Sequence, residues 1–449
     1  MAQNDHVFYR SQRKKLALIE RGKGIYLYDK NGKRYIDGSS GAVISNIGHA
    51  VSPIIKAMQE QAEKVEFVHG TVFKSEKAIE LASRIIELCP GDLDKAYLVS
   101  GGSEAIETAL KMTRSYHVAR GKTQKSVIVS RWQSYHGATM GALSMGGRTM
   151  SRRLYQPYLS DFPHISPAYC YRCPYGQQPS DCDCPCAWEL EAAINQVGAE
   201  YIAAFIAEPI VGATLTAASP PSQYFPIIRQ ICDKYDILFI ADEVMTGFGR
   251  TGKNFGIEHW GIVPDILVSG KGLGAGYYPL AAAICSGKVY AAFQDILGKF
   301  AHGFTYQGNP LAAAVGLSVL DYIEDNGLIK HVAHEGEYLL EKLSGLSQFD
   351  MVGDVRGKGF MTGVELVTDK HTKRPFPPDE KVTKRVAEAA WNRGLIIYPD
   401  ESNGQVQGVA GDGFMVAPPF ITTKEEITEI VRILEESIDE VGQTLGANR

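Results

Sequence analysis

The most constraining feature of the sequence is an acid and a lysine that each follow a short apolar run. Asp242 comes directly after the run at 237–241, and Lys271 follows the run at 266–269 after a single glycine. Runs of this kind are typical of strands that are buried in a parallel sheet. Open α/β sheets bind their ligands at the carboxyl ends of such strands, so we expect both side chains at one ligand site. An amine and an acid so placed suggest imine chemistry, in which the amine forms a Schiff base and the acid keeps a ring nitrogen protonated.

Strands alternate with helices through the middle of the chain, which predicts a mostly parallel sheet. Helical spacing of apolar residues lies between several of the strands, as at 78–85 and 224–235. The predicted fold class is therefore α/β. The apolar runs that predict its strands lie at 96–99, 127–129, 202–207, 238–241, 266–268 and 280–285.

Towards the N-terminus the pattern predicts a hairpin over 24–36, whose turn contains an Asn-Gly pair, a strong turn signal. The small residues at 39–49 predict an irregular loop. After residue 310 the alternation loosens, and a long helical run leads to a last amphipathic helix. Strand-like segments between them lie at 359–367, 395–398 and 414–416.

These changes of pattern predict two structural domains. We interpret 61–325 as the large domain, which contains the sheet and both residues of the opening motif. The segments 1–60 and 326–449 would together form a smaller α+β domain, with the N-terminal hairpin joined to the C-terminal part.

Charge and hydropathy exclude several classes of partner. The net charge of -5 gives no electrostatic reason to expect nucleic acid or an anionic membrane surface. The apolar runs are too short to span a bilayer, and the first six residues lack the apolar segment of a secretion signal. We therefore expect a cytoplasmic protein without nucleic-acid or membrane partners.

The stretch S-G-G-S-E-A at 100–105 predicts an anion site where a strand passes into a helix. The free N–H groups and the helix dipole favour negative charge there. Gly102 would let the backbone approach a ligand, and the hydroxyl of Ser103 would add a donor. Serine is also a common helix cap, so a purely structural role stays open. The stretch is not a dinucleotide fingerprint, which disfavours a nicotinamide dehydrogenase.

Three other residues near the predicted edge of the sheet have both a functional and a structural interpretation. Tyr135, after the strand at 127–129, would stack on a planar ring, although alone it is more typical of a half-buried aromatic residue. The neighbouring His136 is more typical of a structural histidine than of a catalyst. Val244, two residues after Asp242, would pack under such a ring or simply belong to the core.

A cluster of cysteines contains the spacing C-x2-C-x8-C-x3-C at Cys170, Cys173, Cys182 and Cys186. This spacing would suit zinc. Reduced thiols in an inserted loop are the favoured interpretation, and we assign no metal. Eight cysteines in so long a chain do not form a disulfide scaffold.

Taken together, these residues resemble the class III (omega-) aminotransferases, which use pyridoxal 5′-phosphate (PLP) on the type I fold. The motif D-E-V-x-T-G-F-G-R-T-G at 242–252, followed by P-D-I-x-x-x-G-K-G-L-G at 264–274, is highly specific for that family. The resemblance covers nearly the whole chain. It implies a large domain with a mostly parallel sheet and a smaller α+β domain.

The resemblance implies a role for each matching residue around the cofactor ring. Lys271 would hold PLP as a Schiff base and move the proton between the substrate carbon and the cofactor carbon. Asp242 would hold the pyridine nitrogen. Tyr135 would cover one face of the ring and Val244 the other. Glu208, in the segment A-E-P-I, matches a family glutamate near the cofactor.

For the phosphate, the resemblance implies contacts from two subunits. Gly102 and Ser103 would bind the phosphate within one chain. Thr305, in the segment G-F-T-Y-Q-G-N-P, would reach the phosphate of the neighbouring subunit. The active form is therefore expected to be a homodimer or a higher oligomer with shared sites.

Departures from the ornithine-type relatives indicate to which branch of the family the chain is most similar. Ala213 replaces their second glutamate and Met245 replaces a glutamine, as in the branch that acts on amines or omega-amino acids with pyruvate. Many members of that branch have an arginine for the acceptor carboxylate in the loop before A-P-P. Here the loop at 408–413 contains none. Val43 occupies a position that often carries a bulkier residue, which suggests a roomier pocket.

The leading hypothesis is an aminotransferase that moves an amino group from an amine or omega-amino acid to a keto acid, with pyruvate expected. A PLP-dependent racemase or epimerase, a dialkylglycine-type decarboxylase or a lyase on the same fold is the alternative. A non-catalytic α/β binding module is disfavoured because both Asp242 and Lys271 are present.

Overall fold

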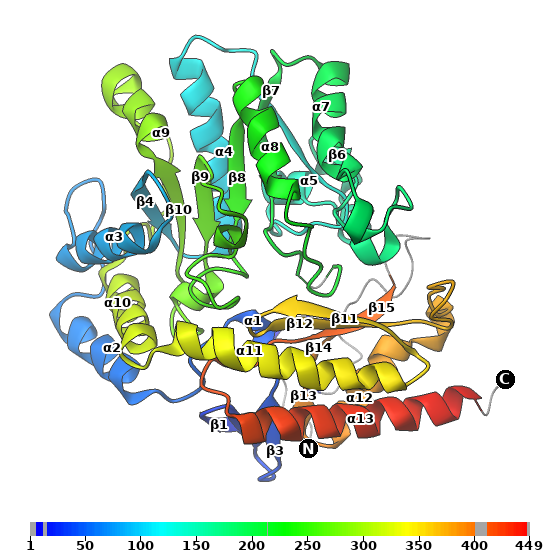
Figure 1. Ribbon diagram of the computed structural model, residues 1–449. Coiled ribbons are helices and arrows are strands. Elements are labelled where there is room, and N and C mark those ends of the chain that lie inside the picture. Colours follow the sequence, from blue (N-terminus) through cyan, green and yellow to red (C-terminus); the bar gives the residue numbers. More distant parts are fainter. Residues whose placement is uncertain (1–5, 12–15, 213, 400–410, 447–449) are drawn as a thin grey trace.

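The computed structural model describes residues 6–11, 16–212, 214–399 and 411–446. A seven-stranded sheet lies at the centre of the large domain, in the order β4-β10-β9-β8-β7-β5-β6 (Figure 1). Strands β7 to β10 are buried along their whole length, as their continuous apolar runs predict. The strands are β4 (Leu93–Val99), β5 (Val127–Arg131), β6 (His164–Ile165), β7 (Ile202–Ala207), β8 (Leu238–Asp242), β9 (Ile266–Ser269) and β10 (Ala281–Ser286).

The predicted mostly parallel sheet is confirmed. Strands β6, β5, β7, β8 and β9 pair in parallel with their neighbours. Strand β10 is the exception, since it runs antiparallel to both β9 and β4. The apolar run at 280–285 predicted this strand but not its direction, because hydropathy alone does not distinguish the two.

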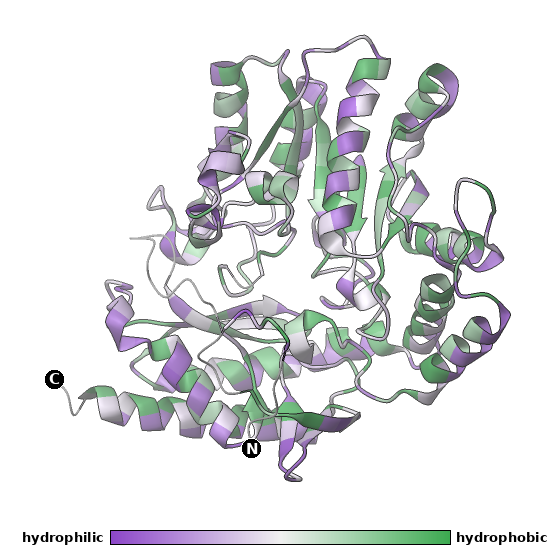
Figure 2. Cartoon of the chain, turned by 180° about the vertical axis from the view of Figure 1, so that it is seen from behind, coloured by the Kyte–Doolittle hydropathy of each residue, from purple (hydrophilic) through white to green (hydrophobic). Residues whose placement is uncertain are grey.

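Helices cover both faces of the sheet, and alternate residues of one strand contact opposite layers. In β8, Phe239 packs with the apolar cluster that includes α7 (Pro185–Val197) and α8 (Tyr224–Lys234). Ile240 packs on the other side with α4 (Gly102–Ala119). Figure 2 shows hydrophobic residues concentrated in the strands and hydrophilic residues on the outer faces of the helices.

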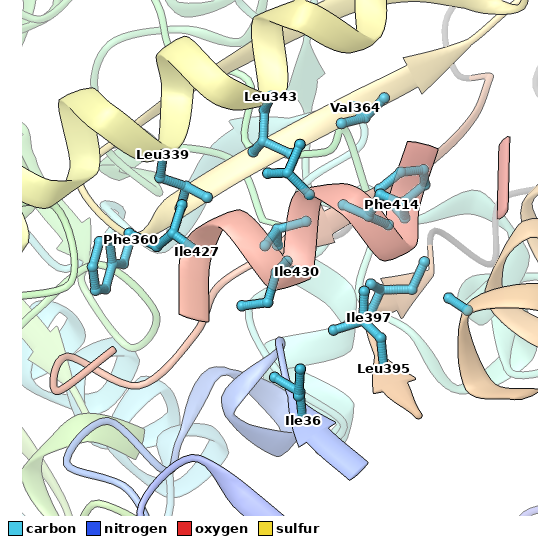
Figure 3. Close-up of a cluster of buried hydrophobic side chains, with 14 of the residues drawn as sticks. Ile36, Leu339, Leu343, Phe360, Val364, Leu395, Ile397, Phe414, Ile427 and Ile430 are labelled. Atoms are coloured by element: carbon cyan, nitrogen blue, oxygen red, sulfur yellow. The ribbon is translucent and has the colours of Figure 1, made fainter. Parts of the chain in front are cut away.

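The smaller part of the chain contains two four-stranded sheets, of order β1-β2-β3-β13 and β11-β12-β15-β14. Figure 3 shows its apolar core, where Leu339 and Leu343 of α11 meet Phe414 and Ile430. Its strands are β1 (Ile19–Lys23), β2 (Tyr26–Asp29), β3 (Arg34–Asp37), β11 (Val352–Lys358), β12 (Met361–Leu366), β13 (Leu395–Ile396), β14 (Tyr398–Pro399) and β15 (Asp412–Val416), and its helices are α11 (Leu328–Ser344), α12 (Val382–Asn392) and α13 (Lys424–Gly446).

The predicted hairpin corresponds to β2 and β3. Strand β3 also pairs in parallel with β13, where Ile36 faces Leu395. This pairing supports the assignment of 1–60 and 326–449 to one domain, although the boundaries of the domains stay a prediction. Strand β1, which pairs with β2, was not predicted, because its sequence lacks an apolar alternation.

The expected irregular loop at 39–49 contains one short turn, α1 (Ser40–Val43), in which Gly41 and Ala42 depart from helical backbone angles. No helix among the described residues is both long enough and apolar enough to cross a membrane. The other α-helices are α2 (Ser52–Lys64), α3 (Glu76–Leu88), α5 (Met140–Met145), α6 (Thr149–Arg152), α9 (Gly287–Ala291) and α10 (Pro310–Asp325).

Candidate active site

The ends of β8 and β9 bring the acid and the lysine of the opening motif to one edge of the sheet. Asp242 is the last residue of β8 and pairs in register with Val268 of β9. Lys271 follows β9 after the single residue Gly270. Because the two strands are parallel neighbours, both side chains lie at the carboxyl edge of the sheet, where α/β folds bind ligands.

Lys271 is held in an unusual backbone conformation and a desolvating environment. Its φ of 38° lies in the left-handed region, which costs a residue with a side chain about 1–2 kcal/mol. Burial lowers the pKa of Lys271 from 10.5 to about 8, and the nearby carboxylate of Asp242 opposes that shift. An amine with such a pKa is unprotonated in about a tenth of molecules at pH 7, far more than an ordinary lysine, and is therefore a better nucleophile.

Asp242 is buried and has a hydrogen-bond partner at each oxygen. Its Oδ2 lies 2.7 Å from Nδ1 of His136, and its Oδ1 accepts from the backbone N–H of Val244 at 3.1 Å. Burial opposes the charged form of His136, but Glu208 and Asp242 outweigh it and raise the pKa of the imidazole. His136, which the sequence favoured as a structural residue, thus contacts the expected ligand of the cofactor ring.

Glu208 fixes the turn that carries the expected stacking residue. It follows β7, and its Oε1 accepts from the backbone N–H of Tyr135 at 2.9 Å. Its Oε2 lies 3.3 Å from Nη2 of Arg131, the last residue of β5. The side chain of Tyr135 remains 46% exposed, so its ring is open to contact by a ligand.

The predicted anion site lies at the start of α4, close to Val244 and to Gly270, the residue before Lys271. A Cβ on Gly102 would lie 2.9 Å from Cγ1 of Val244, so only glycine fits there without a shift. A Cβ on Gly270 would lie 3.6 Å from the same methyl group and 3.7 Å from Cα of Gly102. Ser103 Oγ accepts from the N–H of Ala138 at 3.1 Å, which ties this helix start to the Tyr135 loop.

An apolar wall formed by the two parts of the chain contains the expected pocket residues. Val43 is buried, with a φ of 58°, and Met245 packs against the same cluster. Met245 Sδ lies 2.6 Å from where a Cβ on Gly212 would be. The buried residues of this cluster come from both parts of the chain and are Val43, Ile210, Ala217, Met361, Met415 and Ala417.

One expected site residue does not join the others within the chain. Thr305 is exposed in the loop before α10, and its side chain makes no hydrogen bond with any described residue. A contact between Tyr97 and Gln307 and a 3.2 Å bond from Gly308 N–H to Leu98 O hold this loop on the edge of the sheet. The substitutions expected at position 213 and the loop residues 408–410 lie outside the described residues.

Two buried arginines were missed by the sequence analysis. Arg131 is the last residue of β5 and lies next to Glu208. The sequence signal that could have indicated it is a charged residue at the end of an apolar run. Arg250 lies within the D-E-V-x-T-G-F-G-R-T-G motif and is also fully buried. Its guanidinium donates to Asn46 and to the carbonyls of Phe360 and Pro418, which ties the loop after β8 to the smaller part of the chain.

The cysteines of the predicted cluster have free thiols. The Sγ atoms of Cys184 and Cys186 lie 3.8 Å apart, and all eight cysteines are free. Within the described ranges, no three His, Cys, Asp or Glu side chains are arranged so that they would hold a metal ion.

Comparison with known proteins identifies the family. The model of the family described as aminotransferase class-III matches residues 7–438. The uncharacterized aminotransferase YodT of Bacillus subtilis is 42% identical over 429 residues, which cover 95% of this chain and 96% of that protein.

Solved structures agree with this result. An (S)-enantioselective omega-transaminase from Thermomicrobium roseum superimposes with a TM-score of 0.91 at 37% identity, covering 97% of this chain and 96% of its own. The omega transaminase from Pseudomonas jessenii in complex with PMP gives 0.90 at 36% identity, covering 96% and 94%. The predicted resemblance is confirmed: the chain belongs to the class III aminotransferases and is an enzyme that transfers amino groups.

Proposed function

We propose that this aminotransferase binds PLP at the edge of the sheet and moves an amino group from an amine or omega-amino acid to a keto acid, with pyruvate as the expected acceptor. The observation that carries the proposal is the convergence of Asp242 and Lys271 at the ends of two paired strands. The PMP complex of the Pseudomonas jessenii relative supports a cofactor of this class.

The residues present match the chemical parts of PLP. The first turn of α4 has N–H groups without intrahelical acceptors, which suit a phosphate, and Gly102 and Ser103 belong to that turn. The crowding of Gly102 against Val244 leaves a backbone surface there instead of a side chain. Asp242 is a carboxylate for a protonated ring nitrogen, and Lys271 is an amine for an aldehyde.

PLP, when bound, supplies an electron sink for the substrate carbon that loses a proton. Nζ of Lys271 would hold the aldehyde carbon between turnovers and, once the substrate has released it, accept and return that proton. Its lowered pKa suits both tasks, because proton transfer is efficient when the pKa lies near the working pH. Asp242 would keep the ring nitrogen protonated, with Tyr135 and Val244 on opposite faces of the ring.

The apolar wall around Val43 and Met245 supports a donor amine with an apolar substituent. Side chains from both parts of the chain form it, so the substrate would bind between them. The described end of the loop before A-P-P, Gly411 to Gly413, contains no arginine for a carboxylate. The proposed donor and acceptor are nevertheless those of the family branch that Met245 favours, in which an amine or omega-amino acid reacts with pyruvate.

A homodimer or higher oligomer with shared sites is part of the proposal. Thr305 lies exposed on its loop, where a second copy of the chain can approach it. Tyr306, the residue after Thr305, is a large side chain that is 58% exposed and stacks edge-on with Phe67, so this loop presents an apolar ring to a partner. A cytoplasmic location stays a prediction.

A chemical test of the proposal maps the cofactor on the chain. Purified protein is incubated with PLP, treated with borohydride and digested, and the peptides are analysed by mass spectrometry. The expected result is one pyridoxyl adduct, on Lys271. An adduct on a different lysine would contradict the assignment. Loss of CO2 from the donor, racemisation of the donor without alanine formed from pyruvate, or release of ammonia without a keto acid would each support one of the alternative PLP reactions.

A further inference from the structure

His136 lies between two carboxylates inside the site. Its Nδ1 is 2.7 Å from Oδ2 of Asp242, and its Nε2 is 3.9 Å from Oε2 of Glu208. The imidazole is fully buried, and Nε2 has no hydrogen-bond partner among the described residues. The contact with Asp242 therefore fixes the ring at Nδ1, whereas Nε2 faces the carboxylate of Glu208 without a hydrogen bond.

Glu208 is in turn held by Arg131. Nη2 of Arg131 donates to the backbone carbonyl of Glu208 at 2.6 Å and lies 3.3 Å from its Oε2. Arg131 is fully buried, and its guanidinium lies 5.7 Å from the centre of the Tyr224 ring. A buried cation is costly unless it is paired, and Glu208 is the acidic side chain that pairs with Arg131.

The four groups form one buried network that crosses three strands. Arg131 comes from β5, Glu208 follows β7, and Asp242 ends β8, with His136 in the middle. Two carboxylates and one arginine leave a net negative charge in the interior. A protonated His136 balances that excess within the network, and the amine of Lys271 is a further buried cation coupled to Asp242 when it is protonated.

We propose that Arg131 and Glu208 are positioning residues that orient His136 and keep it charged, so that His136 holds Asp242 in place. The inference rests on the proposed function, because Asp242 is the residue assigned to the ring nitrogen of the cofactor. Glu208 acts through His136 and through the N–H of Tyr135, and neither Glu208 nor Arg131 needs to touch the cofactor.

The network predicts shifts of opposite sign when its two outer members are neutralised. The charged groups that face His136 are Asp242, Glu208 and Arg131, and the last of these lowers its pKa while the two carboxylates raise it. Glu208→Gln removes an anion, so the pKa of His136 falls by about one unit or more. Arg131→Met removes a cation, so the pKa of His136 rises. A residue that only supports packing would not give two opposite shifts.

The experiment follows the imidazole directly. The full-length chain is prepared with 13C-labelled histidine, and His136→Asn identifies the resonance. The chemical shift is then titrated with pH in Glu208→Gln, Glu208→Asp and Arg131→Met, before and after addition of PLP. Glu208→Asp, which keeps the charge, is expected to restore most of the wild-type pKa. Equilibrium dialysis should show weaker retention of PLP in Glu208→Gln, by about tenfold.

A matched control removes a carboxylate at the amino ends of the strands, opposite to the edge of the sheet where Asp242 and Lys271 lie. Asp265 precedes β9 and pairs with Arg229 at 2.8 Å, and Asp265→Asn should leave the His136 titration unchanged. An unchanged pKa in Glu208→Gln would overturn the inference, and so would shifts of the same sign in Glu208→Gln and Arg131→Met. If Arg131→Met does not fold, the pair Glu208→Gln and Glu208→Asp decides. Opposite shifts in a protein that transfers no amino group would sustain the network and reject the proposed function.

Discussion

Nη2 of Arg250 donates to Oδ1 of Asn46 over 2.6 Å, and this bond joins the loop after β8 to the loop before α2. Nη1 of the same guanidinium donates to the carbonyls of Phe360 and Pro418 at 3.0 and 2.6 Å. One buried cation therefore links the segment that carries Asp242 to both ends of the smaller part of the chain.

Arg250→Met is expected to destabilise the protein by about 3 kcal/mol, because it leaves buried carbonyl groups without donors. Arg432 is a matched arginine at the surface, where it is 56% exposed and pairs with Glu436 on the same helix. Its replacement by Met should cost less than about 1 kcal/mol. Urea unfolding measures both values, and equal losses would show that the buried bonds of Arg250 contribute little.

The lowered pKa of Lys271 predicts the pH dependence of its reactivity. In the cofactor-free chain, modification of this amine by an electrophile should increase through pH 8, and not through 10.5 as for an ordinary lysine. Asp242→Asn should lower the midpoint further, since that carboxylate raises the pKa. Peptide mass spectrometry at a series of pH values measures the rate at which Lys271 is modified. A midpoint of this rate near pH 10.5 would contradict the burial of the amine.

The same shift has a consequence for stability. Between pH 8 and 10.5 the unfolded chain holds a proton at Lys271 that the folded chain has released. The free energy of unfolding should therefore increase as the pH rises across this interval. The size of the increase is the contribution that the titration of Lys271 makes to the pH dependence of stability. Comparison with Lys271→Met, which lacks the titrating group, isolates that contribution in urea unfolding.

Gly102 and Gly101 form a matched pair for the anion site. A Cβ on Gly102 would lie 2.9 Å from Val244, whereas a Cβ on Gly101 would meet nothing within 4 Å. Gly102→Ala should weaken PLP binding by about tenfold or more, and Gly101→Ala should change it little. Fluorescence titration of the cofactor-free chain measures both. Equal affinities would indicate that the start of α4 does not lie against the cofactor.

Mixed dimers test the contribution of Thr305 to the neighbouring site. Lys271→Ala and Thr305→Glu are each expected to be inactive or nearly so as separate proteins. A hybrid of the two would contain one site with both Lys271 and Thr305 intact, so activity should return on mixing and refolding. Absence of recovery, with hybrid formation shown by native mass spectrometry, would place Thr305 outside the shared site.

The sequence predicted the parts of the fold and site that depend on local pattern. Asp242 and Lys271 were expected together because each follows a continuous apolar run, and runs of this kind end at one edge of a parallel sheet. The antiparallel direction of β10 was not predictable from its run of small apolar residues, since pairing depends on the connections around it.

The charged network required the three-dimensional arrangement. Arg131 and Glu208 are separated along the chain and meet only because β5 and β7 are neighbours. His136 is next to Tyr135 in sequence, but nothing in the local pattern indicates which nitrogen faces Asp242. The role of Thr305 depends on a second copy of the chain, so it followed only from the family resemblance and stays a proposal.

Lys271 and Asp242 would together transfer an amino group, and the fate of an isotope label on the donor nitrogen measures this transfer. The PLP-loaded protein is given a 15N-labelled amine and unlabelled pyruvate, and the alanine formed is analysed by mass spectrometry. The wild-type chain is expected to form 15N-alanine, Asp242→Asn is expected to form much less, and Lys271→Ala is expected to form no labelled alanine. Labelled alanine formed at the wild-type rate by Lys271→Ala would contradict this expectation.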